Sequence, residues 1–295
     1  MLVLGFEDYC EAGQRLAKEL GVTYAEVEVH RFPDGEHRIT LPALLPERVI
    51  VCRSLFEPNE KLIDLLLLAG TARELGVKQL VLVAPYLCYM RQDKAFHPGE
   101  SVSQRIVGKL LANHFDALIT VDPHMHRTPN LAAAVPVGQA LNLSAAVPIA
   151  GYLQGLPARP LLVGPDEESR QWVQAIAALT GLNYIIGEKR RSGDRNIEIA
   201  LPEADVAGQD VVLIDDIIST GCTLARAAEH LLSLGARNVR CIATHILPNG
   251  GAAKELAKAG VVELLSTDSI QHPSNRIFLA SLLAEAVHTI DWTDI

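Results

Sequence analysis

The sequence predicts an α/β fold made of two domains, each with a mostly parallel sheet flanked by helices. Three observations lead to this prediction. Short runs rich in Val, Ile and Leu recur without polar alternation, as strands buried on both faces do. Amphipathic helical patterns separate several of these runs, and that alternation favours parallel sheets. The length of 295 residues is enough for two domains of ordinary size.

The individual elements follow from where each apolar run begins and ends. Strands are expected at residues 2–4, 48–52, 79–84, 117–121, 160–164, 183–187, 197–201, 210–214, 239–243 and 262–265. Helices are expected at 59–75, 101–114, 167–180, 223–234 and 252–259, where apolar residues recur with helical spacing. The terminal pattern at 278–287 predicts one more helix.

The domain boundary is expected within residues 128–148, which are rich in Ala, Pro and Val and have no long period. This places an N-terminal domain at 1–143 and a C-terminal domain at 144–295. The terminal helix near 280–295 is a candidate to join the first domain. Each half contains a comparable set of strands and helices, although no repeat is visible residue by residue.

Composition and charge exclude several classes of protein. The net charge of −9 argues against a nucleic-acid partner. No apolar run approaches the roughly 18 residues of a membrane helix, and the first residues lack the basic region and cleavage site of a secretory signal. We therefore expect a cytoplasmic protein with no membrane partner. The five cysteines form no C-x-x-C pair, which indicates reduced thiols rather than disulfides or a zinc site.

The most informative segment is a predicted strand that leads into two carboxylates and a hydroxyl-rich turn. Asp215 and Asp216 follow four apolar residues, and a helix is expected to start near Thr223. Backbone N–H groups at such a turn and helix start can bind a phosphate monoester, while the carboxylates suit sugar hydroxyls or the water shell of a magnesium ion. The turn contains Ser219, Thr220, Gly221, Cys222 and Thr223.

A simpler interpretation is a strand followed by a capped helix, with Thr220 or Thr223 as the cap. That interpretation does not account for two adjacent acids after an apolar strand. The segment resembles the ribose 5-phosphate loop of the type I phosphoribosyltransferase fold. In that fold the carboxylates bind the ribose hydroxyls and the turn binds the 5-phosphate.

Three polar clusters in the N-terminal half of the sequence are further candidates for a binding site. The run 31–36, Arg-Phe-Pro-Asp-Gly-Glu, has strong turn chemistry and alone predicts only a hairpin. The run 91–93, Arg-Gln-Asp, follows one predicted strand, and His124 follows another. Ligands of open α/β sheets collect at the carboxyl ends of strands, so these clusters are candidates for a binding site.

Together these motifs resemble the ribose-phosphate pyrophosphokinase family, the 5-phosphoribosyl 1-diphosphate synthetases, over most of the chain. The resemblance implies two type I phosphoribosyltransferase-like domains, transfer of the diphosphoryl group of ATP to ribose 5-phosphate, Mg²⁺ as cofactor, and a homo-oligomer with an ATP site at a subunit interface. It assigns ATP binding to Phe32, Asp34, Glu36, Arg91, Gln92 and Asp93, the metal to His124 and Asp166, catalysis to Lys189 and Arg191, and ribose 5-phosphate binding to Asp215, Asp216, Ser219, Thr220, Gly221, Cys222 and Thr223.

Simpler interpretations remain open for some of these residues. Asp166 suits the cap of the helix that follows it, and residues 189–191 suit a solvated charge run. The resemblance instead makes 189–195 a catalytic loop, which we expect to be poorly ordered without ligands.

The chain departs from the family pattern at several positions. Ser219 stands where many members have Asp, and Cys222 stands where a small residue is usual. Glu167 and Glu168 bring negative charge close to the expected diphosphate position. The short chain and the continuation after Asp93 resemble the archaeal-type branch, so control by phosphate and ADP is not expected.

Two alternatives compete with the synthetase. A phosphoribosyltransferase that consumes the activated sugar would share the loop at 215–223 but would not need the clusters at 32–36 and 91–93. A catalytically silent regulatory paralogue would be expected to lose catalytic side chains. The chain retains Lys189, Arg191, Asp215 and Asp216, which disfavours that reading.

Overall fold

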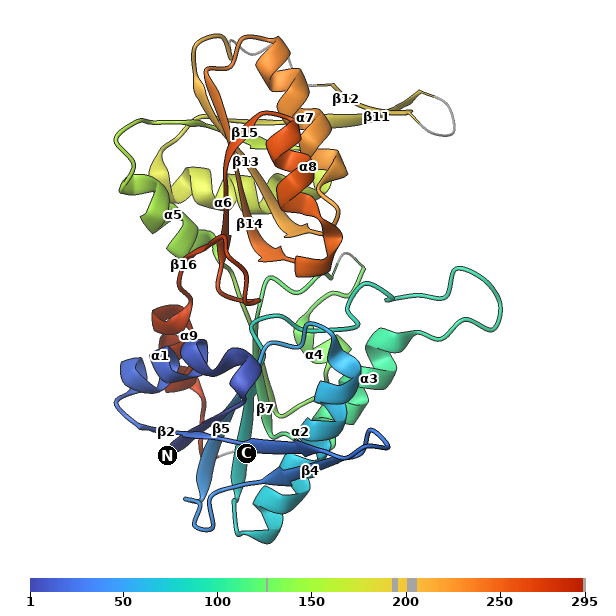
Figure 1. Ribbon diagram of the computed structural model, residues 1–295, viewed down its shortest axis with the longest axis vertical. Helices are drawn as coiled ribbons and strands as arrows, with labels where there is room; N and C mark the ends of the chain where they lie inside the picture. Colours follow the sequence, from blue (N-terminus) through green and yellow to red (C-terminus); the bar gives the residue numbers. More distant parts are fainter. Residues whose placement is uncertain (126, 193–195, 201–205, 294–295) are drawn as a thin grey trace. The chain divides into compact units, whose positions relative to one another are not determined.

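The computed structural model describes residues 1–125, 127–192, 196–200 and 206–293, without the side chains of 188–200. Contacts divide the chain into two compact units (Figure 1). Unit 1 contains Met1–Leu143 and Leu279–Ile295, and unit 2 contains Ser144–Phe278. No helix of the described residues combines the length and apolar character needed to cross a membrane.

Unit 1 is built on a six-stranded sheet in the order β2-β1-β5-β6-β7-β8, in which all neighbours are parallel. The central strands are buried along almost their whole length because helices cover both faces, which explains their continuous apolar sequence. The strands are β1 (Leu2–Gly5), β2 (Thr23–Glu26), β5 (Arg48–Cys52), β6 (Gln79–Val83), β7 (Ala117–Val121) and β8 (Gln139–Leu143).

Helices of unit 1 pack their apolar faces on this sheet. Leu65 and Leu68 of α2 are fully buried in one cluster with strand residues such as Val51 and Leu82. The terminal helix α9 packs beside α1, so the end of the chain returns to the unit that contains its start (Figure 1). The helices are α1 (Cys10–Leu20), α2 (Pro58–Glu74), α3 (Ser103–Ala112), α4 (Leu131–Ala134) and α9 (Ala280–Thr289).

Unit 2 repeats the arrangement with a parallel sheet in the order β10-β9-β13-β14-β15-β16. Its strands are β9 (Leu161–Gly164), β10 (Tyr184–Ile186), β13 (Asp210–Ile218), β14 (Asn238–Ile246), β15 (Val261–Thr267) and β16 (Asn275–Ile277). Its helices are α5 (Ala146–Gln154), α6 (Arg170–Thr180), α7 (Cys222–Ser233) and α8 (Ala252–Lys258), with short 3-10 helices at Glu167–Ser169 and Pro248–Gly250.

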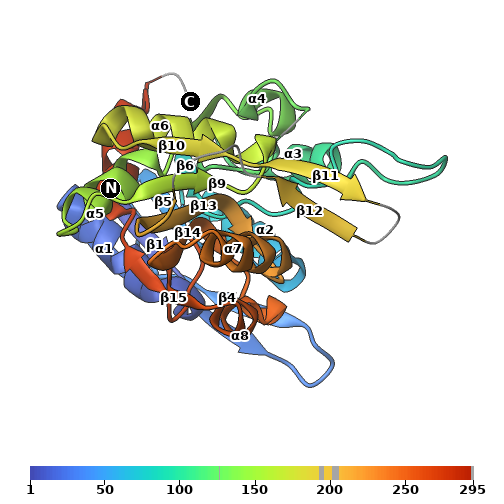
Figure 2. The ribbon, with the colours of Figure 1, turned by 90° about the horizontal axis from the view of Figure 1, so that it is seen from above.

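Each unit also inserts an antiparallel hairpin at the same point of its strand sequence, after the second sheet strand. In unit 1 the hairpin is β3 (Glu28–Arg31) with β4 (His37–Thr40). In unit 2 it is β11 (Glu188–Ser192) with β12 (Asn196–Ala200). Figure 2 shows both hairpins as ribbons that extend from their units. The common strand order and the common insertion indicate two similar domains, as the family resemblance implies, although no residue-level repeat is visible.

The α/β prediction is confirmed, and three of the differences concern β13, α1 and α5. Strand β13 extends to Ile218, four residues beyond the prediction, so Asp215 and Asp216 lie inside the strand and not after it. Helix α1 was not predicted, because only Gly13, Leu16 and Ala17 are buried and its apolar face is narrow. Helix α5 was not predicted either, since Pro148 breaks the pattern; proline is tolerated there because it lies in the first turn.

Candidate active site

The end of β13 brings two carboxylates together in unit 2. Asp216 is buried and Asp215 is half-buried, and the backbone N–H of Asp216 donates to Oδ1 of Asp215 at 3.0 Å. Desolvation by the surrounding protein, together with the charges of Asp216 and Asp166, raises the pKa of Asp215 well above its ordinary value. This crowding of negative charge favours a ligand that brings hydroxyl donors or a cation.

The turn after β13 leads directly into α7. Gly221 is the N-cap of α7, with φ of 78° in the left-handed region that favours glycine. The N-cap is thus Gly221 and not Thr220 or Thr223, although Oγ1 of Thr220 accepts from the N–H of Cys222 at 3.5 Å. The first N–H groups of a helix have no partner within it, so this helix start offers donors for a phosphate. Thr220 and Cys222 are exposed and Ser219 and Thr223 partly exposed, which leaves the turn accessible.

A second loop supports this turn, and the sequence analysis missed it. The loop after β14 contains the 3-10 helix Pro248–Gly250, and a Cβ atom on Gly250 would lie 1.7 Å from the carbonyl oxygen of Ser219. The backbone N–H of Leu247 donates to the carbonyl of Ile218 at 2.9 Å. The two loops are therefore in direct backbone contact. The adjacent glycines 250 and 251 were the signal in the sequence.

Asp166 follows β9 and caps the 3-10 helix Glu167–Ser169. Its Oδ1 accepts from the N–H groups of Glu168 and Ser169, at 3.0 and 3.2 Å. The capping interpretation is thus confirmed, and the charge of Asp166 still acts on Asp215. The negative charge of Glu167 is partly compensated, because its carboxylate pairs with Arg170 at 2.5 Å.

The predicted ATP residues of unit 1 fall on two loops. Phe32, Asp34 and Glu36 are exposed at the tip of the β3–β4 hairpin, where the N–H of Phe32 donates to the carbonyl of Glu36 at 2.8 Å. Oδ1 of Asp34 accepts from the N–H of Glu36 at 3.2 Å. The tip is therefore an ordered turn with its side chains exposed.

The other loop, after β6, separates its three predicted residues. Arg91 is exposed and Gln92 is partly buried, whereas Asp93 is buried and forms an ion pair with Arg127 at 3.1 Å. The carboxylate of Asp93 is thus directed at a neighbouring loop. That neighbouring loop follows β7 and holds the partly buried His124.

The predicted catalytic residues Lys189 and Arg191 lie on β11, paired with Ile199 and Ile197 of β12. Their side chains lie outside the described residues. Residues 193–195 also lie outside the described part, and with them the predicted disorder of the loop at 189–195.

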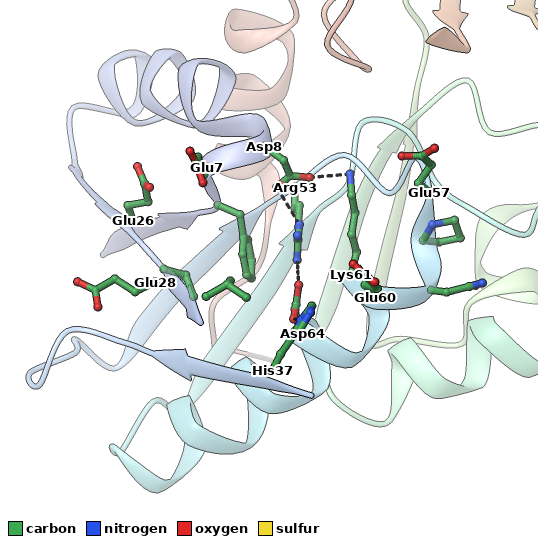
Figure 3. Close-up of a pocket in the computed structure, with 15 residues that line it drawn as sticks. Glu7, Asp8, Glu26, Glu28, His37, Arg53, Glu57, Glu60, Lys61 and Asp64 are labelled. Carbon is green, nitrogen blue, oxygen red and sulfur yellow. Dashed lines mark hydrogen bonds and ion pairs between the residues drawn. The ribbon is translucent and has the colours of Figure 1, made fainter. Parts of the chain in front are cut away.

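Unit 1 also contains a cavity of about 860 Å³ that the sequence analysis did not identify. Figure 3 shows an ion-pair chain on its wall. Arg53 contacts Asp64 at 2.8 Å and Asp8 at 3.1 Å, while His37 contacts Asp64 at 2.7 Å and Lys61 contacts Asp8 at 2.6 Å. Arg53 and Asp64 are buried, and such charges persist inside a protein only when paired.

Comparison with known proteins assigns the chain to a family. Residues 1–114 match the N-terminal domain of ribose phosphate pyrophosphokinase, and residues 156–276 match the phosphoribosyl transferase domain. The ribose-phosphate pyrophosphokinase of Methanopyrus kandleri is 38% identical over 98% of this chain and 99% of that protein. This chain belongs to the ribose-phosphate pyrophosphokinase family.

Further similarities extend this family assignment. The ribose-phosphate pyrophosphokinase of Thermococcus kodakarensis is 36% identical over 88% of this chain and 91% of that protein. The crystal structure of phosphoribosylpyrophosphate synthetase from Mycobacterium smegmatis matches with a TM-score of 0.82 and 25% identity, covering 97% of each chain. The family resemblance inferred from the six motifs is confirmed, as is the type I phosphoribosyltransferase-like fold.

Proposed function

We propose that the protein is a cytoplasmic ribose-phosphate diphosphokinase that makes 5-phosphoribosyl 1-diphosphate and AMP from ATP and ribose 5-phosphate. The observation that carries the proposal is the geometry at the end of β13. Two acids lie beside a turn that opens onto a helix start capped by Gly221. The family assignment supports the same activity, because its curated relatives bear the name ribose-phosphate pyrophosphokinase.

Ribose 5-phosphate is assigned to the loop at 215–223. Asp215 and Asp216 are suited to the ribose 2- and 3-hydroxyls, since a hydroxyl donates to a carboxylate. The hydroxyls of Ser219, Thr220 and Thr223, with the N–H groups of Gly221 and Cys222, are suited to the 5-phosphate. The raised pKa of Asp215 is consistent with this role, because bound hydroxyl donors replace the solvation that burial takes from its carboxylate.

ATP is assigned to Phe32, Asp34 and Glu36 on the hairpin and to Arg91 and Gln92 on the loop after β6. An aromatic ring suits stacking on adenine, and the guanidinium of Arg91 suits a phosphate. Because the hairpin tip is exposed, it is available to contact a second copy of the chain. This supports the proposal of a homo-oligomer, dimer or higher, that shares its ATP site between subunits.

Mg²⁺ is the proposed cofactor, and the donor chemistry in unit 2 fits it. Asp166, Asp215 and Asp216 carry hard oxygen donors, and burial together with the charges of the other two raises the pKa of Asp215. Within the described residues no three acids, histidines or cysteines are grouped closely enough to hold a metal ion alone. That agrees with the habit of Mg²⁺ to bind one or two carboxylates together with substrate phosphates. We propose Asp166 in unit 2 and His124 in unit 1 each as a metal contact, and the chemistry of the ion would be neutralisation of phosphate charge.

The transfer itself needs positioning and charge neutralisation more than a strong base. The oxygen of the ribose 1-hydroxyl bonds to the β-phosphorus of ATP, the bond from that phosphorus to the α–β bridging oxygen breaks, and AMP leaves with that oxygen. The hydroxyl proton is lost to solvent. We assign Lys189 and Arg191 to the charge of the transferring group.

The test compares two reactions catalysed by the purified protein. We expect 5-phosphoribosyl 1-diphosphate from MgATP and ribose 5-phosphate, and no nucleotide from 5-phosphoribosyl 1-diphosphate and a free base. The reverse result would establish the phosphoribosyltransferase alternative. A Lys189→Ala variant should bind ATP normally and lose at least about 100-fold in kcat. Full turnover by this variant would contradict the assignment of Lys189.

A further inference from the structure

A buried glutamine connects the two loops of unit 1 that hold proposed ATP and metal contacts. The first loop runs from β6 to α3 and contains Arg91; the second follows β7 and contains His124. Gln104 lies in the first turn of α3, and the residue is only 2% exposed. It belongs to none of the motifs that the sequence analysis identified.

Gln104 holds the backbone on both sides of Arg91. Its Nε2 donates to the carbonyl of Met90 at 3.2 Å, and its backbone N–H donates to the carbonyl of Gln92 at 3.2 Å. Its Oε1 accepts from the hydroxyl of Thr128 at 2.7 Å, which reaches the second loop. The side chain of Gln104 therefore links the carbonyl of Met90, next to Arg91, to the loop of His124, and its backbone holds Gln92.

The ion pair between Asp93 and Arg127 makes a second link between the same two loops. Nη1 of Arg127 donates to both carboxylate oxygens of Asp93, at 3.1 and 3.3 Å. Each link ends close to a proposed ligand contact. The first holds Met90, the residue before Arg91, and the second holds Arg127, three residues after His124. Two polar links across one loop pair restrict the movement of each loop relative to the other.

We propose that Gln104 is a positioning residue for ATP: it fixes the backbone at Arg91 relative to the His124 loop. This inference rests on the proposed function. Arg91 is exposed, so the direction of its guanidinium depends on how firmly its own backbone is held, and small displacements of binding groups weaken a site strongly. The buried face of α3 is otherwise formed by Val107, Gly108 and Leu111. A buried amide at this face costs desolvation, which the hydrogen bonds to Met90 and Thr128 offset.

Three variants separate positioning from packing. Gln104→Leu keeps the volume approximately and removes both side-chain hydrogen bonds, and we expect a rise of about tenfold in KM for ATP with KM for ribose 5-phosphate unchanged. Thr128→Val should raise KM for ATP about threefold. The double variant should equal Gln104→Leu, because Thr128 acts through the same amide. Val107→Ala, a packing control on the same helix, should lower Tm and leave both KM values unchanged.

Direct binding makes the test independent of turnover. Calorimetric Kd values for MgATP and for ribose 5-phosphate are measured for the wild type and for Gln104→Leu. A selective loss of ATP affinity supports the proposal even if the wild type does not turn over, which would count only against the proposed function. Equal changes in both Kd values, or unchanged ATP affinity in Gln104→Leu, would overturn it. A wild type that does not bind ATP would overturn both proposals.

Discussion

The carbonyl oxygen of Ser219 occupies the space that a side chain on Gly250 would need, since a Cβ atom there would lie 1.7 Å away. The proposed phosphate turn therefore rests directly on the loop after β14. A second contact supports the same arrangement, because a Cβ atom on Gly221 would lie 3.1 Å from Cα of Ala252. The turn is held by backbone packing from a segment that carries no ligand group of its own.

Replacing Gly250 by alanine should displace the turn at Ser219. We expect Gly250→Ala to raise KM for ribose 5-phosphate by about tenfold or more, because the backbone donors lose their alignment. KM for ATP should change less. Steady-state kinetics with each substrate varied in turn measures both values.

The matched control is Gly151→Ala in α5 of the same unit. A Cβ atom there meets nothing within 4 Å, and the residue lies in a helix where alanine is favoured. This variant should keep both KM values and gain slightly in Tm. Equal kinetics for the two variants would show that the contact with Ser219 does not hold the turn.

The raised pKa of Asp215 predicts a cost in stability that a neutral side chain relieves. An acid whose pKa is higher in the folded state binds more protons there, so stability falls as pH rises from about 4 to the folded pKa and stays lower above it. Asp215→Asn should therefore raise Tm at pH 7 by about 2–4 °C. The gain should shrink towards pH 4, where Asp215 of the folded wild type is already protonated.

Thermal unfolding at pH 7 and pH 4 checks this prediction, provided that the wild type unfolds reversibly at both. A lower Tm for Asp215→Asn at both pH values would contradict it. The stabilised variant should also bind ribose 5-phosphate more weakly, since its amide is a poorer partner for two hydroxyls. A variant that is more stable but binds its ligand less well is expected where the binding groups themselves destabilise the free protein.

The buried pair of Arg53 and Asp64 predicts a large loss of stability when one charge is removed. Asp64→Asn leaves the guanidinium of Arg53 without its buried counter-ion, which should cost about 3 kcal/mol and lower Tm by about 6–12 °C. Glu60→Gln is the control, because Glu60 pairs with Arg31 at 2.9 Å on the exposed surface, where a pair contributes less than about 1 kcal/mol. Similar Tm values for the two variants would show that the buried pair of Arg53 and Asp64 contributes no more to stability than an exposed pair.

The sequence was sufficient to predict the central strands, because strands buried on both faces are continuous apolar runs. Strands β5 and β7 have the predicted bounds, at Arg48–Cys52 and Ala117–Val121. The edge strands β2 and β8 were not predicted, since they are half exposed and carry polar residues such as Thr23. The strand order, and with it the similarity of the two units, depends on pairing between distant segments, which one sequence without repeats does not reveal.

In the candidate site, too, some residues could be predicted from the sequence and others could not. The acids and hydroxyls at 215–223 lie in one short segment, so their motif can be recognised in the sequence. Gly250 contacts Ser219 and Gln104 contacts Thr128, and each pair is far apart in the sequence. Only the folded structure brings these residues together. The separation of Asp93 from Arg91 was also not predictable, because burial of the carboxylate depends on Arg127.

The most direct test of the account is AMP formation from MgATP with and without ribose 5-phosphate. We predict that AMP appears only when the sugar phosphate is present, in equal amount to 5-phosphoribosyl 1-diphosphate. AMP formation without the sugar phosphate, or no AMP from folded protein that binds both substrates, would contradict the proposed function.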